Sequence, residues 1–156
     1  MKLITRFKFF LWYFGHFKVP LIGHLKPKLI SLDSRKIVIM LPLNQRSKNH
    51  FNTMYFGALA VGADLACGFH GFYHAEQEKV KISLAFKSFR AQFLKRPESD
   101  VYFISEMGEQ VKEMLDESKA GNSRVNRMIK VNAYINYLKN PELVAEFELE
   151  LSIKVL

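Results

Sequence analysis

One carboxylate stands in a stretch of side chains that otherwise suit close packing. Residues 55–69 read YFGALAVGADLACGF, and Asp64 is the only charged residue among them. A buried carboxylate without a partner costs several kcal/mol of stability or takes up a proton. Asp64 therefore either pairs with a lysine or arginine of a neighbouring element or takes part in chemistry as an acid, base or nucleophile.

Composition limits the partners that such a carboxylate can have. A chain of 156 residues, 49% hydrophobic and 24% charged, fits one globular domain with a sizeable core. The formal net charge of +8 favours anionic partners: phosphate-bearing ligands, nucleic acid or an acidic membrane surface. The single cysteine excludes an internal disulfide and fits a reducing compartment, so we expect a cytoplasmic protein.

The N-terminal segment, MKLITRFKFFLWYFGHFKVPLIGHL, is aromatic and basic. Lys8 and Lys18 interrupt its apolar run and no small-x-small cleavage site follows, which argues against a signal peptide. No window is long and apolar enough for a membrane span. We expect an amphipathic helix over about 3–16, within an extension of residues 1–28, that packs on the domain or covers a ligand channel. Contact with a membrane surface is the alternative interpretation.

The elements that must position Asp64 follow from the hydrophobic patterns. Residues 29–43 are typical of a hairpin or a bent strand, 79–94 and VYFIS of strands, and 106–119 of an amphipathic helix with Gly121 just past its end. Residues 125–135 and 143–155 alternate clearly and are joined by the turn YLKNPE. Residues 54–75 are predicted as a glycine-rich helix capped by Asn52 or Thr53, with the glycines allowing another backbone to approach. The prediction is an α+β domain: one antiparallel sheet packed on one long helix.

The stretch NHFNTMYFGALAVGAD, residues 49–64, resembles a motif of hotdog-fold acyl-CoA thioesterases of the phenylacetate-degradation type. The family pattern N-x5-H-G-G-x6-D places its Asn on Asn49, its second Gly on Gly57 and its catalytic acid on Asp64 without a gap. FLKRP, residues 93–97, is similar to the family's F-L-x-P. The longer match, including the N-terminal extension, is to uncharacterised relatives assigned only provisionally to the thioesterases. The resemblance covers residues 29–156 and implies a curved antiparallel sheet wrapped around a long central helix, with the N-terminal amphipathic helix as an addition.

The resemblance implies hydrolysis of an acyl-CoA or acyl-carrier-protein thioester without a cofactor or metal. Asp64 would be general base or nucleophile, and both roles stay open. The backbone amides of Phe56 and Gly57 would polarise the thioester carbonyl at the helix N-terminus. Tyr55 replaces the family's His, and Phe56 replaces its first Gly, so the pocket is expected to be narrowed or reshaped.

The spacing of these groups predicts a homodimer. Asp64 lies eight residues beyond Phe56, about 12 Å along a helix. One helix cannot both polarise and attack the same carbonyl group over that distance. Two antiparallel helices can do so if Asp64 of one chain meets the amides of the other, with isologous contact along the glycine- and alanine-rich helix. A dimer of dimers stays open.

Further residues are assigned to the site with alternatives beside them. Asn49 is expected to orient the water or thioester, unless it only satisfies turn backbone. Tyr55 and Asn52 are expected to contact the substrate. Four basic residues at the end of a predicted strand are expected to hold coenzyme A phosphates, unless they only form a solvated edge: Lys87, Arg90, Lys95 and Arg96. His70 and His74 have the i, i+4 spacing of a metal-binding pair, and Cys67 lies one turn earlier. There is no third ligand of suitable spacing, so we predict no metal site and assign Cys67 to the core.

Three other functions fit parts of the sequence. A hydratase or dehydratase would want a His paired with the acid, and Tyr55 occupies the place for one. A noncatalytic lipid- or acyl-CoA-binding module would use the basic surface and the N-terminal aromatic residues. Nucleic-acid binding fits the net charge, but the chain has no RNP, KH or zinc pattern, and Glu146, Glu148 and Glu150 line one strand. Thioester hydrolysis is the prediction, and the binding module is its main alternative.

Overall fold

The computed structural model describes all residues, 1–156, and contains one six-stranded sheet. The strands are β1 (Lys28–Leu32), β2 (Ile37–Leu41), β3 (Ile82–Phe93), β4 (Val101–Ser105), β5 (Val125–Ile135) and β6 (Glu142–Val155). Their order in the sheet is β1-β2-β4-β5-β6-β3, and every neighbouring pair is antiparallel. This confirms the predicted hairpin, the two long C-terminal strands and the α+β class.

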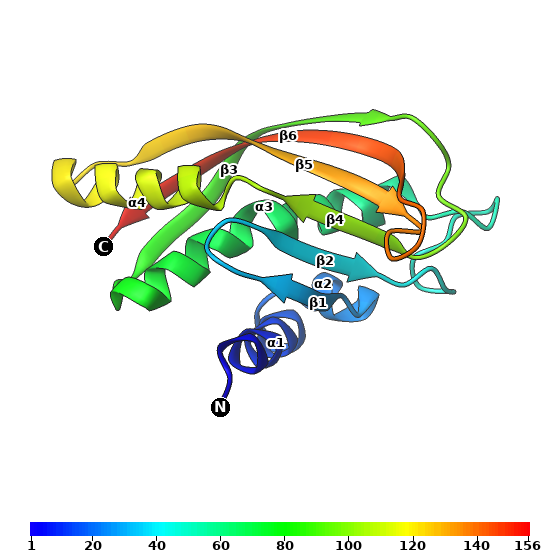
Figure 1. The fold of residues 1–156 in the computed structure, drawn as a ribbon, viewed down its shortest axis with the longest axis horizontal. Helices are drawn as coiled ribbons and strands as arrows, with labels where there is room; N and C mark the ends of the chain where they lie inside the picture. Colours follow the sequence, from blue (N-terminus) through cyan, green and yellow to red (C-terminus); the bar gives the residue numbers. More distant parts are fainter.

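The long helix α3 (Phe56–Glu78) runs across the concave face of this sheet (Figure 1). Its buried side is made mostly of Ala, Leu and Gly, so the helix sits close to the strands. The Phe103 ring of β4 occupies the space that a Cβ at Gly62 would need, and Leu84 of β3 does the same at Gly71. The glycines therefore accommodate the chain's own aromatic and aliphatic side chains. The expectation that another backbone approaches them is wrong.

The helix α3 begins without a side-chain cap. Its N-cap residue is Tyr55, in an extended conformation with φ −62° and ψ 137°. The predicted caps are wrong: Asn52 has a left-handed backbone, with φ 59°, and Thr53 is bonded to Asn49. Both residues are drawn into the preceding loop by local side-chain hydrogen bonds, which compete with capping.

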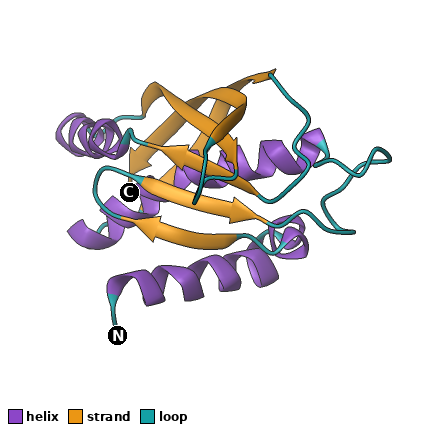
Figure 2. Ribbon diagram, turned by 45° about the vertical axis from the view of Figure 1, so that its right-hand side comes forward, coloured by secondary structure: helices purple, strands orange, loops and turns teal.

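The N-terminal segment folds as helices against the outer side of α3 and β1 (Figures 1 and 2). It contains α1 (Leu3–Tyr13), a π-helical turn η1 (Phe14–Lys18) and α2 (Pro20–Leu25), so the expected helix is confirmed and a second one follows it. Gly15 and Gly23 touch backbone to backbone where η1 crosses α2. Phe7 packs edge-on against Phe69 of α3, which joins the segment to the main core.

The remaining helix, α4 (Gly108–Gly121), covers the far end of β5 and β6 (Figure 1). It ends at Asn122, which takes the left-handed conformation, with φ 47°, expected just beyond a helix. Gly121 is thus the last helical residue rather than the one past the end. Ser118, predicted on its apolar face, is buried and accepts a hydrogen bond from the Val155 amide at 2.9 Å.

Candidate active site

Asp64 lies in the third turn of α3, where the helix faces the N-terminal helices and β3. Its side chain forms no hydrogen bond and no ion pair, so the expected alternative of a lysine or arginine partner from the sheet is not what the structure shows. It lines a cavity of about 200 Å³ whose other walls are apolar: Phe14, Val19, Ile22, Leu65, Gly68, Phe69, Phe72, Leu84 and Phe86. The carboxyl group is therefore free to act on a molecule in that cavity.

Burial raises the pKa of Asp64 to about 6. The cause is desolvation alone, because no cation or donor near the carboxylate stabilises its charged form. A carboxylate of this pKa is a stronger base than an exposed aspartate and is still ionised near neutral pH. Those are the properties that a general base needs.

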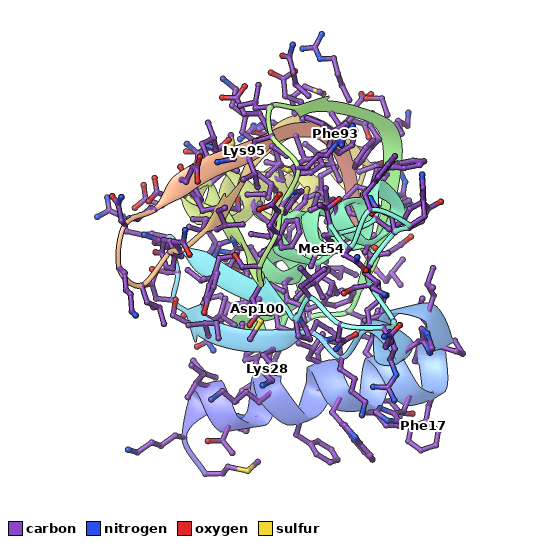
Figure 3. All side chains as sticks on the ribbon, turned by 90° about the vertical axis from the view of Figure 1, so that its right-hand side faces the viewer. Phe17, Lys28, Met54, Phe93, Lys95 and Asp100 are labelled. Carbon is purple, nitrogen blue, oxygen red and sulfur yellow. The ribbon has the colours of Figure 1, made fainter.

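A second hollow lies at the start of α3. It has a volume of about 540 Å³, and its walls come from the loop before α3, the first turn of α3 and the segment after β3: Asn49, His50, Phe51, Thr53, Met54, Tyr55, Phe56, Leu59, Phe93, Leu94, Lys95, Arg96 and Pro97. Figure 3 faces this side of the molecule, with Met54, Phe93 and Lys95 labelled. The hollow combines aromatic surface with two cationic side chains.

The first-turn amides of α3 lie at the end of the helix where this hollow opens, and Phe56 is part of its wall. The N–H groups of Phe56, Gly57 and Ala58 donate to no acceptor within the chain, whereas the amide of Tyr55 donates to the carbonyl of Ser47 at 2.8 Å. Unsatisfied amides and the positive end of the helix dipole together attract an oxygen that carries negative charge. The Tyr55 ring lies over the Cα of Gly57, where any Cβ would collide with it.

Tyr55 thereby explains why position 57 is glycine in this chain. Its ring packs 4.8 Å from that of Phe56, and Phe56 in turn lies 6.3 Å from Phe93. The residue that stands where the related motif has His is thus part of an aromatic wall beside the free amides. The pocket is shaped by these rings.

Asn49 lies at the rim of the hollow with its side chain bonded within the loop. Its Oδ1 accepts from the amide of Phe51 at 2.9 Å, and its Nδ2 donates to Oγ1 of Thr53 at 2.9 Å. Asn52 does not line the hollow; its side chain accepts a bond from Lys48 at 2.9 Å. Asn49 fixes the loop that leads into α3, while Asn52 lies apart from both cavities.

The four basic residues separate into two pairs. Lys95 and Arg96 line the hollow, and Arg96 stacks over the Phe51 ring at 4.8 Å. Lys87 and Arg90 lie farther along β3, where Arg90 pairs with Glu148 of β6. Only the first pair is placed at the start of α3.

The wall also contains residues that the sequence patterns did not single out. His50 packs 4.0 Å from Phe51, and Leu59 and Met54 form the apolar floor. The signal for them was their position: they lie within the motif 49–64, between its matched residues, in the loop and in the first turns of the helix. Polar loop residues were assigned to turn formation, and this hid their place in the wall.

Cys67, His70 and His74 point into the core. Nε2 of His70 donates to the carbonyl of Asp33 at 3.1 Å, and Nε2 of His74 donates to that of Gly108 at 2.8 Å. Burial lowers the pKa of His70 to about 4 and raises the pKa of the Cys67 thiol. The two histidines tie α3 to the β1–β2 turn and to the start of α4. No group of three or more His, Cys, Asp or Glu side chains is arranged to hold a metal ion.

Asp64 and the free amides face different cavities of the same chain. The two cavities share no wall residue, although both lie along α3. The first-turn amides of α3 and the Asp64 carboxyl group are therefore separated along one helix, as the sequence predicted. Within a single chain, neither cavity contains a complete hydrolytic site.

Several known structures share the architecture of this chain. A candidate thioesterase from Shewanella oneidensis superposes with a TM-score of 0.80 at 13% identity, over 96% of this chain and 99% of the other. A protein of unknown function from Chlorobaculum tepidum TLS gives a TM-score of 0.83 at 14% identity, over 97% and 96%. Zebra fish thioesterase superfamily member 2 gives 0.65 at 10% identity, over 100% and 99%.

The chain has the hotdog fold. This confirms the fold that the motif 49–64 implied, with α3 as the central helix and the sheet curved around it. No protein-family model matches the sequence, and no curated protein matches it significantly.

In this hotdog fold, β3 is an edge strand that pairs only with β6. A bulge between Phe86 and Ser88 shifts its alternation, so Phe89 and Phe93 lie opposite Leu149 and Ala145, on the concave face. The two rings are 46% and 49% exposed although they face inward. An uncovered apolar strip thus joins the open sheet edge to the start of α3.

Proposed function

We propose that this protein hydrolyses acyl-CoA or acyl-carrier-protein thioesters as a homodimer. The observation that carries the proposal is a largely buried, unpaired carboxylate at an apolar cavity, on the same helix whose first-turn amides have no acceptor. The fold shared with proteins named as thioesterases supports the same chemistry. Asp64 acts as base or nucleophile, and the amides of Phe56 and Gly57 stabilise the oxygen of the reacting carbonyl group.

The dimer brings the two half-sites together. The residues that a second copy can contact are the exposed ones along the β3 edge and at the start of α3, namely Phe56, Phe89 and Phe93. The expected contact along the glycine and alanine residues of α3 stays a prediction: most of these residues are buried within the chain, but Gly57 and Ala60 are partly exposed on the same stripe as Asp64. Pairing of two β3 edges about a twofold axis brings the Asp64 cavity of one chain toward the amides of its partner.

Substrate then spans the two cavities. The acyl group occupies the apolar cavity beside Asp64, roofed by Phe14 and Ile22 of the N-terminal helices. The phosphates of coenzyme A or of a carrier-protein phosphopantetheine lie near Lys95 and Arg96. Water, activated by Asp64, adds to the carbonyl carbon; the C–S bond breaks, and the protonated carboxyl group returns its proton to the thiolate. In the nucleophilic variant, an anhydride with Asp64 forms first and water then hydrolyses it.

The deciding experiment is a panel of acyl-CoA substrates with release of free thiol as readout, run on the wild type and Asp64→Asn. Thiol release by the wild type and its loss in the variant support hydrolysis. Binding of acyl-CoA with equal affinity by both proteins, and turnover by neither, identifies the noncatalytic binding module instead.

The shared site is tested by complementation. Phe56→Pro removes one donor amide but fits the fold, because Pro is tolerated in the first helical turn and Tyr55 before it is already extended. Phe56→Ala is the matched control that keeps the amide. In mixed dimers of Asp64→Asn and Phe56→Pro, one of the two sites is intact, so an equimolar random mixture should recover about a quarter of wild-type activity. No recovery contradicts a site shared between subunits.

A further inference from the structure

The outward face of the N-terminal helices is a second exposed apolar surface, separate from both cavities proposed for catalysis. Residues Phe9, Trp12, Tyr13 and Phe17 follow one another at helical spacing on the side of α1 and η1 opposite the buried Phe7 and Leu11. Phe9 is 60% exposed and Phe17 64%, and Leu21 of α2 adds to them at 59%. We call these five residues the N-terminal aromatic surface.

The rings of this surface form a continuous layer. Trp12 lies 5.6 Å from Phe9 and 6.0 Å from Phe17, and Tyr13 lies 5.3 Å from Phe17. Figure 3 shows α1 along one margin of the molecule, with a row of side chains pointing away from the rest of the chain and Phe17 labelled at its end. A margin formed by one helix can lie flat on an extended surface.

The charges around this layer are of one sign. Residues 1–32 contain no Asp or Glu, and their basic residues are Lys2, Arg6, Lys8, Lys18, Lys26 and Lys28. Arg6 is paired with Glu76, and the five lysines form no ion pair. Unpaired lysines around exposed aromatic rings complement a surface that is apolar beneath and negatively charged at its boundary.

A hollow of about 620 Å³ beside α1 extends this complementarity. Its walls include Lys8, Lys26 and Lys28 together with Trp12 and His16. Three ammonium groups around one hollow suit a phosphate group, and the adjacent indole and imidazole rings suit the interfacial region where apolar and polar layers meet. The hollow can take the headgroup of a phospholipid while the neighbouring rings enter the acyl layer.

We propose that the N-terminal aromatic surface docks the protein on the surface of an anionic phospholipid bilayer. No helix is long and apolar enough to cross a membrane, so the contact is peripheral. Aromatic rings supply insertion at the interface, and the lysines supply attraction to anionic headgroups. The opposite side of the same helices still packs on α3, so docking leaves the predicted covering role of the segment in place. The proposal does not depend on thioester hydrolysis.

Trp12, the only tryptophan of the chain, provides the measurement. The full-length protein is titrated with vesicles of phosphatidylcholine and with vesicles that also contain phosphatidylglycerol, and Trp12 emission and co-sedimentation are recorded. We expect a blue shift and sedimentation with the anionic vesicles, weakened by added salt because charged headgroups are screened. Equal behaviour with both vesicles, or no shift with either, overturns the proposal.

Two variants separate the two contributions. Phe9→Ala combined with Phe17→Ala keeps the fluorescent probe and is expected to weaken partition at least about tenfold. Lys8→Ala, Lys26→Ala and Lys28→Ala together are also expected to weaken it at least tenfold, since each lysine near an anionic surface is worth about a factor of five. All these side chains are exposed, and thermal melts confirm that the variants fold.

Matched controls lie elsewhere on the surface. Leu138→Ala with Met128→Ala removes exposed apolar side chains, and Lys81→Ala, Lys130→Ala and Lys139→Ala remove three exposed lysines. We expect both controls to partition like the wild type. Losses in the controls equal to those in the test variants overturn the proposal. A Trp12 blue shift that follows protein concentration without vesicles also overturns it, because a second copy then covers this surface.

Discussion

Two regions of this molecule expose aromatic side chains, and their surroundings differ. The strip of Phe56, Phe89 and Phe93 adjoins an open strand edge, and two of its basic neighbours, Arg90 and Lys95, are paired with Glu148 and Glu142. The N-terminal aromatic surface has no strand edge and is bordered by lysines without acidic partners.

The difference teaches that apolar exposure alone does not identify a partner. Unpaired backbone groups on an edge strand and balanced charge fit a second copy of the chain. A helical face with satisfied backbone and charge of one sign fits a lipid boundary. Substitutions on each surface separate these two roles.

The largest expected effect is on turnover. Asp64→Asn removes the base or nucleophile and is expected to lower kcat by about 10² to 10⁴. Vesicle partition measured with Trp12 should stay at the wild-type value, because Asp64 lies in the cavity behind the N-terminal helices and not on their outward surface. Loss of both properties in this variant would mean that the two regions act as one.

Next is the association of subunits. Phe89→Asp with Phe93→Asp places two charges on the concave strip and is expected to weaken dimerisation at least about thirtyfold, as interface hot spots do. Analytical ultracentrifugation measures the shift, and activity should fall with the dimer. Met128→Asp, on an exposed residue of β5, is the control. Dimers that resist the double change would place the subunit contact elsewhere.

The third effect is on stability. The pKa of Asp64 is raised in the folded chain, so the folded state favours the protonated form and loses stability as pH rises from about 4 through about 6. Asp64→Asn carries no such penalty and should be more stable by up to about 3 kcal/mol near pH 8. Thermal melts should show a higher Tm for the variant near pH 8 and nearly equal values near pH 4. A variant less stable at both pH values would reveal a partner for the carboxylate.

The same raised pKa predicts the pH dependence of catalysis. With Asp64 acting as base, kcat/KM should rise about tenfold per pH unit below pH 6 and level off above it. Stopped assays across this range measure the profile. A rate that is flat between about pH 4 and 7 would remove Asp64 from the rate-determining step.

The smallest effect is on substrate affinity. Arg96→Ala should raise KM for acyl-CoA about fivefold with little change in kcat, because a surface cation contributes about 1 kcal/mol to phosphate binding. Lys26→Ala is the control, because Lys26 lines only the hollow beside α1. Lys26→Ala should weaken vesicle partition and leave KM unchanged. If Lys26→Ala raised KM and Arg96→Ala weakened vesicle partition, Lys26 rather than Arg96 would belong to the substrate site.

Much of this fold could be predicted from alternation and helical periodicity. The C-terminal strands were placed within a residue of their observed bounds, because each buries one face and exposes the other. The bulge at Lys87 was missed, although the apolar positions change from even to odd numbers after Phe86. The role of the glycines in α3 was also missed, since it depends on Phe103 and Leu84, which are distant in sequence.

For the site, the motif placed Asp64, Phe56 and Gly57 on one helix, but not the walls around them. Local patterns do not show that the loop containing Asn49 bonds mainly to itself, or that Lys87 lies apart from Lys95. They also do not show that Asp64 lacks a cation, because a partner could have come from any strand. Contacts between distant segments decide all three points.

The two faces of β3 depend on its length as well as its composition. The bulge absorbs Lys87, so a chain without Lys87 would pair Phe86, Ser88 and Phe89 with the same partners in regular alternation. A residue gained or lost between Phe89 and Phe93, without a second bulge, would instead turn Phe93 to the convex side, away from Phe56 and from the start of α3. Insertions and deletions in this strand therefore change which residues form the exposed strip, even when no side chain is replaced.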